Sequence, residues 1–129
     1  MKLLFVSTNR LKRVMPPVPL GLASVIAQID EMRHEVRVLD FMFMEEPERE
    51  AREMLNEFQP DLIAVSVRNI DNQSFLHPEY YLPETKGFIE LFRKHSKALV
   101  VAGGPAFTVS PVAIFSYLSD RDPVVFRNI

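Results

Sequence analysis

Short apolar runs alternate with amphipathic segments along this chain. Three continuous apolar runs end in small or polar residues, as buried parallel strands do: residues 3–6, 62–65 and 98–102. Alternation over residues 34–40 and a short apolar run at 124–126 predict two further strands. Apolar positions three and four residues apart predict helices between the strands, over residues 20–32, 47–58, 84–96 and 110–118.

Strands that alternate with helices predict an α/β fold with a parallel sheet. We expect a doubly wound, five-stranded sheet with right-handed crossovers, helices on both faces and the strand order 2-1-3-4-5. A final helix, which would normally cover the last strand, is missing from the pattern. No shift in composition marks a boundary, so we expect one domain over residues 1–129.

The composition excludes several classes of function. The chain has 129 residues and a net charge of −2, which gives no electrostatic basis for binding nucleic acid. It has no cysteine, which excludes disulfides, thiol nucleophiles and an iron–sulfur cluster held by this chain. No apolar run approaches the roughly 20 residues of a membrane span, and the first residues are too short for a signal peptide. We therefore expect a cytoplasmic protein without a membrane partner.

The loops that follow the strands hold the unusual residues. In a doubly wound sheet, ligands bind beyond the carboxyl ends of the strands, where the strand order reverses, here between strands one and three. The loops there are residues 7–19, 66–83 and 103–110. The polar stretch from Asn69 to Pro83 far exceeds the usual connection of about two to six residues and carries several aromatic side chains. We expect it to be ordered against another part of the molecule and to contact a ligand.

Several residues in these loops have two interpretations each. Ser66 either faces a ligand or simply ends its strand. The polar side chains after it either bind amides and phosphates or form hydrogen bonds within the loop: Arg68, Asn69, Asp71 and Asn72. Gly103 and Gly104 either admit a flat ligand close to the backbone or form a plain tight turn.

Familiar catalytic motifs are absent. The chain lacks the G-x-G-x-x-G and Walker glycine loops and the G-x-S-x-G nucleophile elbow. Ser66 stands where a response-regulator receiver needs an acidic phosphoacceptor, and no pair of histidines has metal-ligand spacing. These absences disfavour a small α/β enzyme or receiver, and we predict no metal ligands and no catalytic residues in this chain.

Four segments together resemble the N-terminal cobalamin-binding domain of radical SAM enzymes. They are residues 15–23 (MPPVPLGLA), 34–40, 60–72 (PDLIAVSVRNIDN) and 103–105 (GGP). The resemblance implies a flavodoxin-like (Rossmann-like) domain that holds cobalamin over the carboxyl ends of its strands, with Ser66 and its neighbours near the corrin or its nucleotide tail. The cofactor-binding residues it implies are Thr8, Asn9, Pro17, Leu20, Gly21, Ser66, Val67, Arg68, Asn69, Asp71, Asn72, Gly103, Gly104 and Pro105.

The chain departs from related domains in two ways. The cobalamin domains of methionine synthase and the mutases carry a D-x-H-x-x-G motif after the first strand, whose His binds cobalt. Residues 7–12 here contain neither the Asp nor the His, so we expect cobalamin without a protein His ligand to cobalt. The radical SAM barrel and its C-x-x-x-C-x-x-C motif are also absent, so we expect a cut-out domain or a shortened relative.

Two hypotheses from different classes follow. The first is a cobalamin-binding module that delivers or accepts a methyl group beside a radical SAM barrel in its parent system. The second is an interaction domain that keeps the fold without the ligand. Because the last strand lacks its helix, we expect a homodimer in either case. Retention of hydroxocobalamin by the purified protein separates the two hypotheses.

Overall fold

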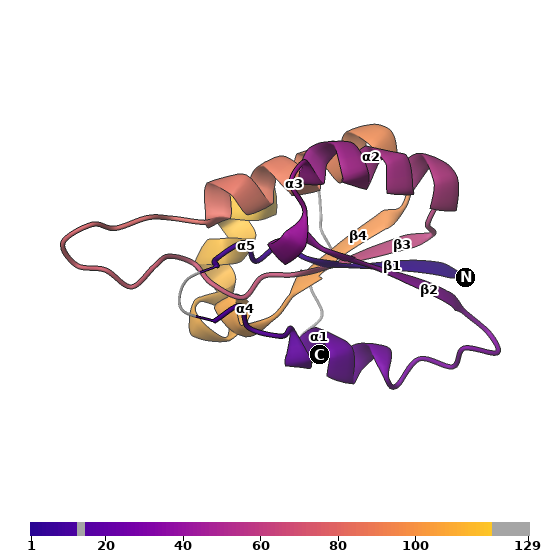
Figure 1. Ribbon diagram of the computed structural model, residues 1–129, viewed down its shortest axis with the longest axis horizontal. Coiled ribbons are helices and arrows are strands. Elements are labelled where there is room, and N and C mark those ends of the chain that lie inside the picture. The colour runs from indigo at the N-terminus through magenta and orange to yellow at the C-terminus, as the bar shows by residue number, and fades with distance from the viewer. Residues whose placement is uncertain (13–14, 120–129) are drawn as a thin grey trace.

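A computed structural model describes residues 1–12 and 15–119. Its elements, shown in Figure 1, are β1 (Lys2–Ser7), α1 (Leu20–Ile26), β2 (Glu35–Asp40), the 3₁₀ helix η1 (Phe41–Phe43), α2 (Pro47–Phe58), β3 (Leu62–Ser66), α3 (Leu82–His95), β4 (Leu99–Gly103), α4 (Pro105–Val109) and α5 (Pro111–Ser119). In this part of the chain, no helix combines the length and the apolar character needed to cross a membrane.

The strands form a parallel sheet in the order β2-β1-β3-β4. This confirms the α/β class and the predicted order of the first four strands. The described residues hold four strands rather than five, and the fifth strand predicted at 124–126 lies outside them. The carboxyl ends align, because Ser7 pairs with both Asp40 and Ser66, and Ser66 pairs with Gly103.

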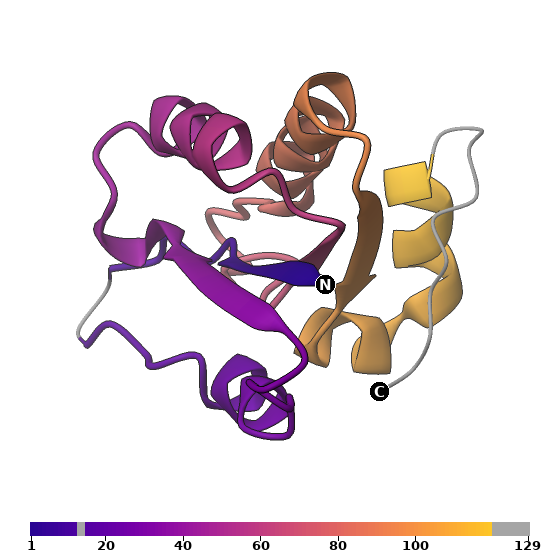
Figure 2. The same cartoon turned by 90° about the vertical axis from the view of Figure 1, so that its right-hand side faces the viewer.

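The main core lies on the face of the sheet that α2 and α3 cover (Figure 2). Strand side chains point alternately to the two faces, so Leu4 and Ile63 share this face, and both have no exposed surface. Phe41 of η1 packs against Phe88 of α3 with ring centroids 4.5 Å apart. Burial of this kind stabilises the fold by about 25 cal/mol per Å² of apolar surface removed from water.

The opposite face is covered less completely. Leu22 of α1 packs against Leu3 and Phe5 of β1 to form a small second core. Val38 on β2 and Leu99 on β4 belong to the same face by register and remain 47% and 48% exposed. The apolar sheet surface on both sides of α1 is thus partly open to solvent in the described part of the chain.

The structure corrects two helix predictions. The helix predicted over 20–32 ends at Ile26. Beyond it, Gln28 N–H and Ile29 N–H bond to carbonyls three residues back, which is the pattern of a 3₁₀ turn and not of an α-helix. Asp30 then caps the turn by accepting from Met32 N–H at 3.0 Å. The second correction is α4, an unpredicted five-residue helix that begins directly after Gly104 with Pro105 in its first turn.

The remaining helices match their predictions closely. Helix α2 spans the predicted 47–58, and α5 begins and ends one residue later than the predicted 110–118. Helix α3 begins at Leu82, two residues before the predicted start, because Pro83 fits the first turn of a helix. Its last turn carries Arg93, Lys94 and His95, which suit the negative end of the helix dipole.

Candidate functional site at the carboxyl edge

Hydrogen bonds hold the strand-end loops together at the carboxyl edge of the sheet. Both the backbone N–H and the Oγ1 hydroxyl of Thr8 donate to the Ser66 carbonyl, at 3.4 and 3.1 Å. Val67 N–H donates to the Gly103 carbonyl at 2.8 Å. The ends of β1, β3 and β4 therefore form one continuous edge, which is where a parallel sheet places its ligands.

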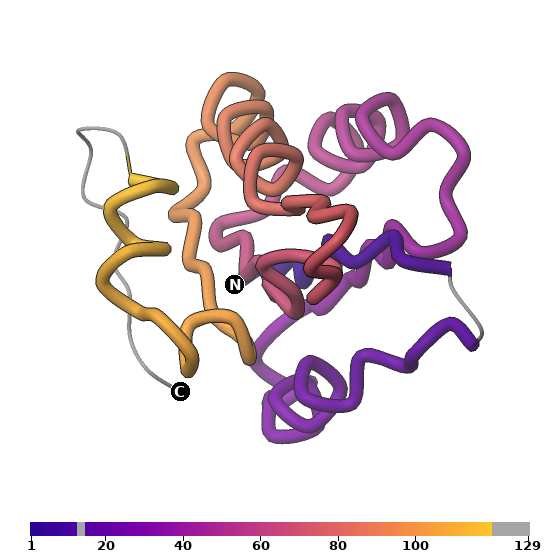
Figure 3. The backbone as a smooth tube through the Cα atoms, turned by 90° about the vertical axis from the view of Figure 1, so that its left-hand side faces the viewer, coloured from indigo at the N-terminus to yellow at the C-terminus, as the bar shows by residue number. Residues whose placement is uncertain are grey.

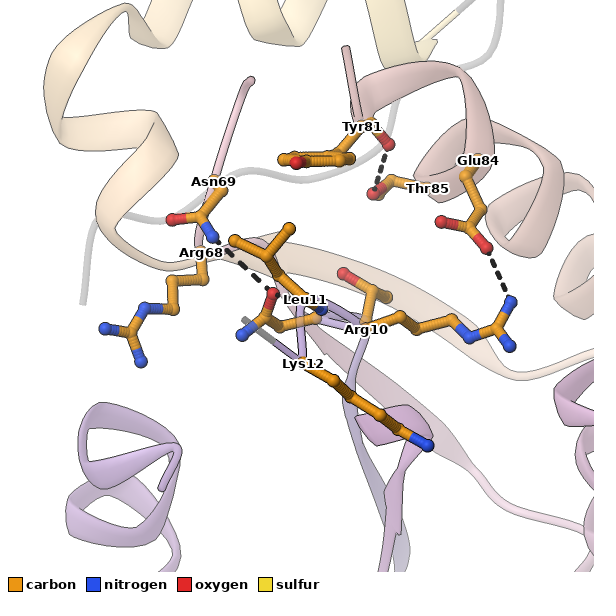
Figure 4. A pocket seen from close by; sticks show the side chains of 10 residues that line it. Arg10, Leu11, Lys12, Arg68, Asn69, Tyr81, Glu84 and Thr85 are labelled. Carbon is orange, nitrogen blue, oxygen red and sulfur yellow. Dashed lines mark hydrogen bonds and ion pairs between the residues drawn. The ribbon is translucent and has the colours of Figure 1, made fainter. Parts of the chain in front are cut away.

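A pocket of about 400 Å³ opens at this edge between the loop after β1, the loop after β3 and the first turn of α3 (Figure 4). It is lined by Thr8, Asn9, Arg10, Leu11, Lys12, Arg68, Asn69, Tyr81, Glu84 and Thr85. Most of these side chains end in hydroxyl, amide or charged groups, which suits a ligand rich in hydrogen-bonding groups.

Two polar contacts cross the pocket. Arg10 Nη1 lies 3.0 Å from Glu84 Oε1, with 38% and 42% of the two side chains exposed. A pair this exposed contributes about 0–1 kcal/mol, so its main effect is to position the loop after β1 against α3. Asn69 Nδ2 lies 3.5 Å from Asn9 Oδ1, a long contact that a ligand amide can replace at small cost.

Arg68 occupies a different part of the pocket. Figure 4 shows its side chain pointing away from the Arg10–Glu84 pair. Arg68 is exposed, and among the described residues its side chain forms no ion pair or hydrogen bond. Its guanidinium therefore presents free donors at the end of β3.

Gly104 is constrained by the backbone of β3. Its φ is 110° and its ψ 179°, a conformation that is essentially restricted to glycine. A Cβ at this position would lie 2.7 Å from the Val67 carbonyl oxygen, whereas a Cβ on Gly103 would meet nothing within 4 Å. The close approach expected at this glycine pair is therefore made at Gly104 by the chain itself.

The long loop after β3 contains an ordered arm, residues 69–81. An antiparallel bridge joins Asp71 to Tyr80, and Tyr81 N–H donates to the Ile70 carbonyl at 2.9 Å. The Asn72 side chain ties the turn together: Oδ1 accepts from Ser74 N–H and Glu79 N–H, at 3.0 and 3.2 Å, and Nδ2 donates to the His77 carbonyl at 2.8 Å. Figure 3 looks onto the carboxyl edge and shows the arm emerging between α3 and α1.

The arm differs from its prediction in how it is ordered. The polar groups of Asp71 and Asn72 form hydrogen bonds within the arm, which is the alternative that the sequence left open. Phe75 does not pack on the rest of the described chain, since it is 98% exposed, and Tyr80 packs only in part, at 65% exposed. Ile70 and Leu82, at the two ends of the segment, pack against the main core, whereas its middle is ordered by local hydrogen bonds and exposes Phe75 and Leu76 to solvent.

The structure brings some of the predicted site residues together and separates others. Thr8, Asn9, Arg68 and Asn69 line the pocket, and Ser66, Gly103, Gly104 and Pro105 follow along the same edge. Val67 is 1% exposed, its side chain lies in the core, and both of its backbone groups form hydrogen bonds. Pro17, Leu20 and Gly21 lie at the start of α1 and do not line the pocket.

Six lining residues were not predicted as site residues: Arg10, Leu11, Lys12, Tyr81, Glu84 and Thr85. The position of residues 10–12, directly after a buried strand, was a usable signal for the first three. Glu84 and Thr85 belong to a helix, and nothing in the helical pattern distinguishes them from other helix residues.

A parallel α/β sheet with an open site at the carboxyl ends of β1 and β3 defines the class of Rossmann-like ligand-binding domains. Comparison with known families is more specific. The profile of the B12 binding domain matches residues 7–127, and the chain belongs to the B12-binding domain family.

Individual relatives agree with this family. Tryptophan 2-C-methyltransferase of Streptomyces laurentii is 28% identical over 107 residues, which are 81% of this chain and 18% of the relative. The structure of the radical S-adenosylmethionine methyltransferase TsrM from Kitasatospora setae, with cobalamin and a [4Fe-4S] cluster bound, aligns with a TM-score of 0.82 and 28% identity over 91% of this chain and 20% of TsrM. The cobalamin-dependent S-adenosylmethionine radical enzyme OxsB shares the fold, with a TM-score of 0.64, 16% identity, and coverage of 89% of this chain and 15% of OxsB.

These findings confirm the resemblance to the cobalamin-binding domain of radical SAM enzymes. The chain spans about a fifth of the length of the relatives it matches.

Proposed function

We propose that this chain is a cobalamin-binding module that holds the cofactor over the carboxyl ends of β1, β3 and β4. The observation that carries the proposal is the match of residues 7–127 to the B12 binding domain, together with the open pocket at this edge. The corrin periphery of cobalamin carries amide side chains, which pair well with hydroxyl and amide groups of a protein.

The residues at the edge fit such a ligand. Asn9 and Asn69 present amides from neighbouring strand ends, and Arg68 presents free guanidinium donors. Gly103 has open space on its Cβ side, so no side chain rises from the end of β4. In this arrangement Asn9 and Asn69 orient the ligand, which lies on the aligned carboxyl ends of β1, β3 and β4.

We propose that the module acts together with a radical SAM domain, as in the methyltransferase TsrM. When bound, cobalamin supplies a cobalt centre able to carry a methyl group. The role of this chain is then to bind and orient the cofactor. It contains no cysteine, so any [4Fe-4S] cluster must be held by another part of the parent system.

We further propose that no protein histidine coordinates cobalt. His34 precedes β2 and His95 ends α3, which places both at the amino edge of the sheet, opposite the pocket. His77 lies on the arm rather than in the loop after β1, where related domains carry the D-x-H-x-x-G histidine. Arg68 and Asn69 are the side chains expected nearest the cobalt, because they directly follow the end of β3.

Electron paramagnetic resonance of the cob(II)alamin complex tests this. A spectrum without nitrogen superhyperfine splitting supports the proposal. Nitrogen splitting that disappears in His77→Ala contradicts it.

Retention of hydroxocobalamin tests the function itself. We expect the purified chain to keep corrin absorbance after desalting, and the double variant Asn9→Ala/Asn69→Ala to keep much less. Asn56→Ala, at an exposed asparagine of α2, is the matched control and should behave as the unmodified chain. A folded, unmodified chain that retains no corrin favours the alternative, an interaction domain that keeps the fold without the ligand.

The predicted homodimer remains a proposal. The half-exposed Val38 and Leu99 on the α1 face support it, because exposed apolar sheet surface tends to be covered by a partner. Light scattering at high protein concentration should give about twice the monomer mass. A strict monomer under those conditions contradicts the dimer.

A further inference from the structure

The arm formed by residues 69–81 has a defined shape. Backbone hydrogen bonds from Tyr81 to Ile70 and from Asn72 to Glu79 hold its two sides together, and Ile70 packs its base against the main core. Connections longer than about 12 residues are uncommon in compact domains and are usually functional when ordered. An arm whose shape is already fixed by the fold loses little conformational entropy when it binds.

The arm is joined to the pocket at both ends. Asn69 begins it and Tyr81 ends it, and both side chains line the pocket. Figure 1 shows that the arm extends beyond the carboxyl edge, away from the sheet and its helices. The arm therefore flanks whatever occupies the pocket and projects past it.

The tip of the arm is apolar and open to solvent. Phe75 is 98% exposed and its neighbour Leu76 is 80% exposed. Exposed aromatic and aliphatic neighbours on a fixed arm are a surface for an apolar partner. Asp71 and Glu79 give the arm negative charge, and residues 69–81 include no Lys or Arg, which disfavours anionic membranes and nucleic acids.

The pocket is small compared with cobalamin. A volume of about 400 Å³ is near the lower end of the range of about 300–1,000 Å³ that encloses drug-sized ligands. Cobalamin is larger than such a ligand, so most of it must lie outside the pocket, over the carboxyl edge. The arm starts and ends at that edge and extends outward from it (Figures 1 and 3).

Resting on the proposed function, we propose that Phe75 and Leu76 bind the solvent-facing side of cobalamin held at the carboxyl edge and slow its release. The polar stem of the arm, centred on Asn72, holds the tip in place, and the apolar tip makes the contact. This assigns cofactor contact to two side chains at the tip, in addition to the polar residues near its base.

The rate of cobalamin release tests the proposal. The full chain is loaded with hydroxocobalamin and desalted, and corrin loss is followed during dialysis. We expect Phe75→Ala/Leu76→Ala to release cobalamin at least about tenfold faster, a change equivalent to about 1.4 kcal/mol. Met32→Ala is the matched control, because Met32 is 95% exposed and lies at the amino edge of the sheet. Circular dichroism verifies that each variant is folded.

A fluorescent reporter locates the contact directly. The chain contains no tryptophan, so the variants Phe75→Trp and Met32→Trp each introduce a single emitter, at the tip and at the opposite edge. The corrin absorbs where tryptophan emits. We therefore expect bound hydroxocobalamin to quench the indole emission of Phe75→Trp far more strongly than that of Met32→Trp.

The outcomes separate this inference from the proposed function. If the unmodified chain retains no corrin, the proposed function and the inference both fail. If corrin is retained, but release from Phe75→Ala/Leu76→Ala is unchanged and the two tryptophan variants are quenched equally, the inference alone fails. The tip would then be free to contact a protein partner instead.

Discussion

Replacing Gly104 by alanine places a methyl group against the backbone at the end of β3. The added Cβ would lie 2.7 Å from the Val67 carbonyl oxygen and 3.1 Å from the Val67 nitrogen. These are main-chain atoms, so the contact cannot be relieved by rotating a side chain. The substituted residue must also hold a φ of 110°, which side chains rarely permit.

The cost of this change follows from two effects. Forcing a residue other than glycine into this backbone region costs about 1–3 kcal/mol. Moving Val67 away weakens its hydrogen bonds to Gly103 and Ala106, of 2.8 and 3.2 Å, each contributing about 1 kcal/mol. A total of about 3 kcal/mol is a large part of the roughly 5–15 kcal/mol that stabilises a typical domain. For a chain of this length it lowers Tm by roughly 10 °C.

Thermal unfolding followed by circular dichroism measures the effect. Gly103→Ala is a close control, because its Cβ meets nothing within 4 Å and its φ lies outside the positive range. We expect Gly103→Ala to unfold within a few degrees of the unmodified chain. Equal melting temperatures for Gly104→Ala and Gly103→Ala would show that β3 and the Gly104 turn are not in the close contact described.

Two other predictions concern the arm and the core. Asn72→Ala removes the side chain that accepts from Ser74 and Glu79 and donates to His77, so limited proteolysis should cut the arm faster while Tm changes little. Phe92→Ala empties a fully buried site and should lower the free energy of unfolding by about 3–5 kcal/mol in urea, whereas Phe75→Ala, at a 98% exposed position, should leave it almost unchanged.

Different results would contradict each of these two predictions. Proteolysis of Asn72→Ala at the same rate as Asn56→Ala would show that the arm does not depend on its central asparagine. Similar losses of stability for the two phenylalanine variants would contradict the assignment of the core to the α2 and α3 face.

Much of the fold was predictable because its signals are local. The apolar run at residues 62–65 lies within β3, and Pro47 and Pro111 begin α2 and α5 as their backbone geometry favours. The end of α1 was not predictable in this way. Apolar spacing continues beyond Ile26, but the turn around Asp30 returns the chain to β2 and ends the helix earlier.

The site was less predictable, because its contacts join residues far apart in sequence. Four residues named at strand ends, Thr8, Asn9, Arg68 and Asn69, do line one pocket. The Arg10–Glu84 pair spans 74 positions, so no local pattern reveals it. The requirement for glycine at 104 likewise depends on the Val67 backbone, which only the folded sheet brings into contact.

The central claim is that this chain binds cobalamin at the carboxyl edge of its sheet. Equilibrium dialysis of the folded protein against hydroxocobalamin, with bound corrin counted by its absorbance, tests the claim most directly. We predict saturation at one corrin per chain, with weaker binding by Asn9→Ala/Asn69→Ala and unchanged binding by Asn56→Ala. A folded chain with no saturable corrin, or equal binding by all three proteins, would contradict the claim.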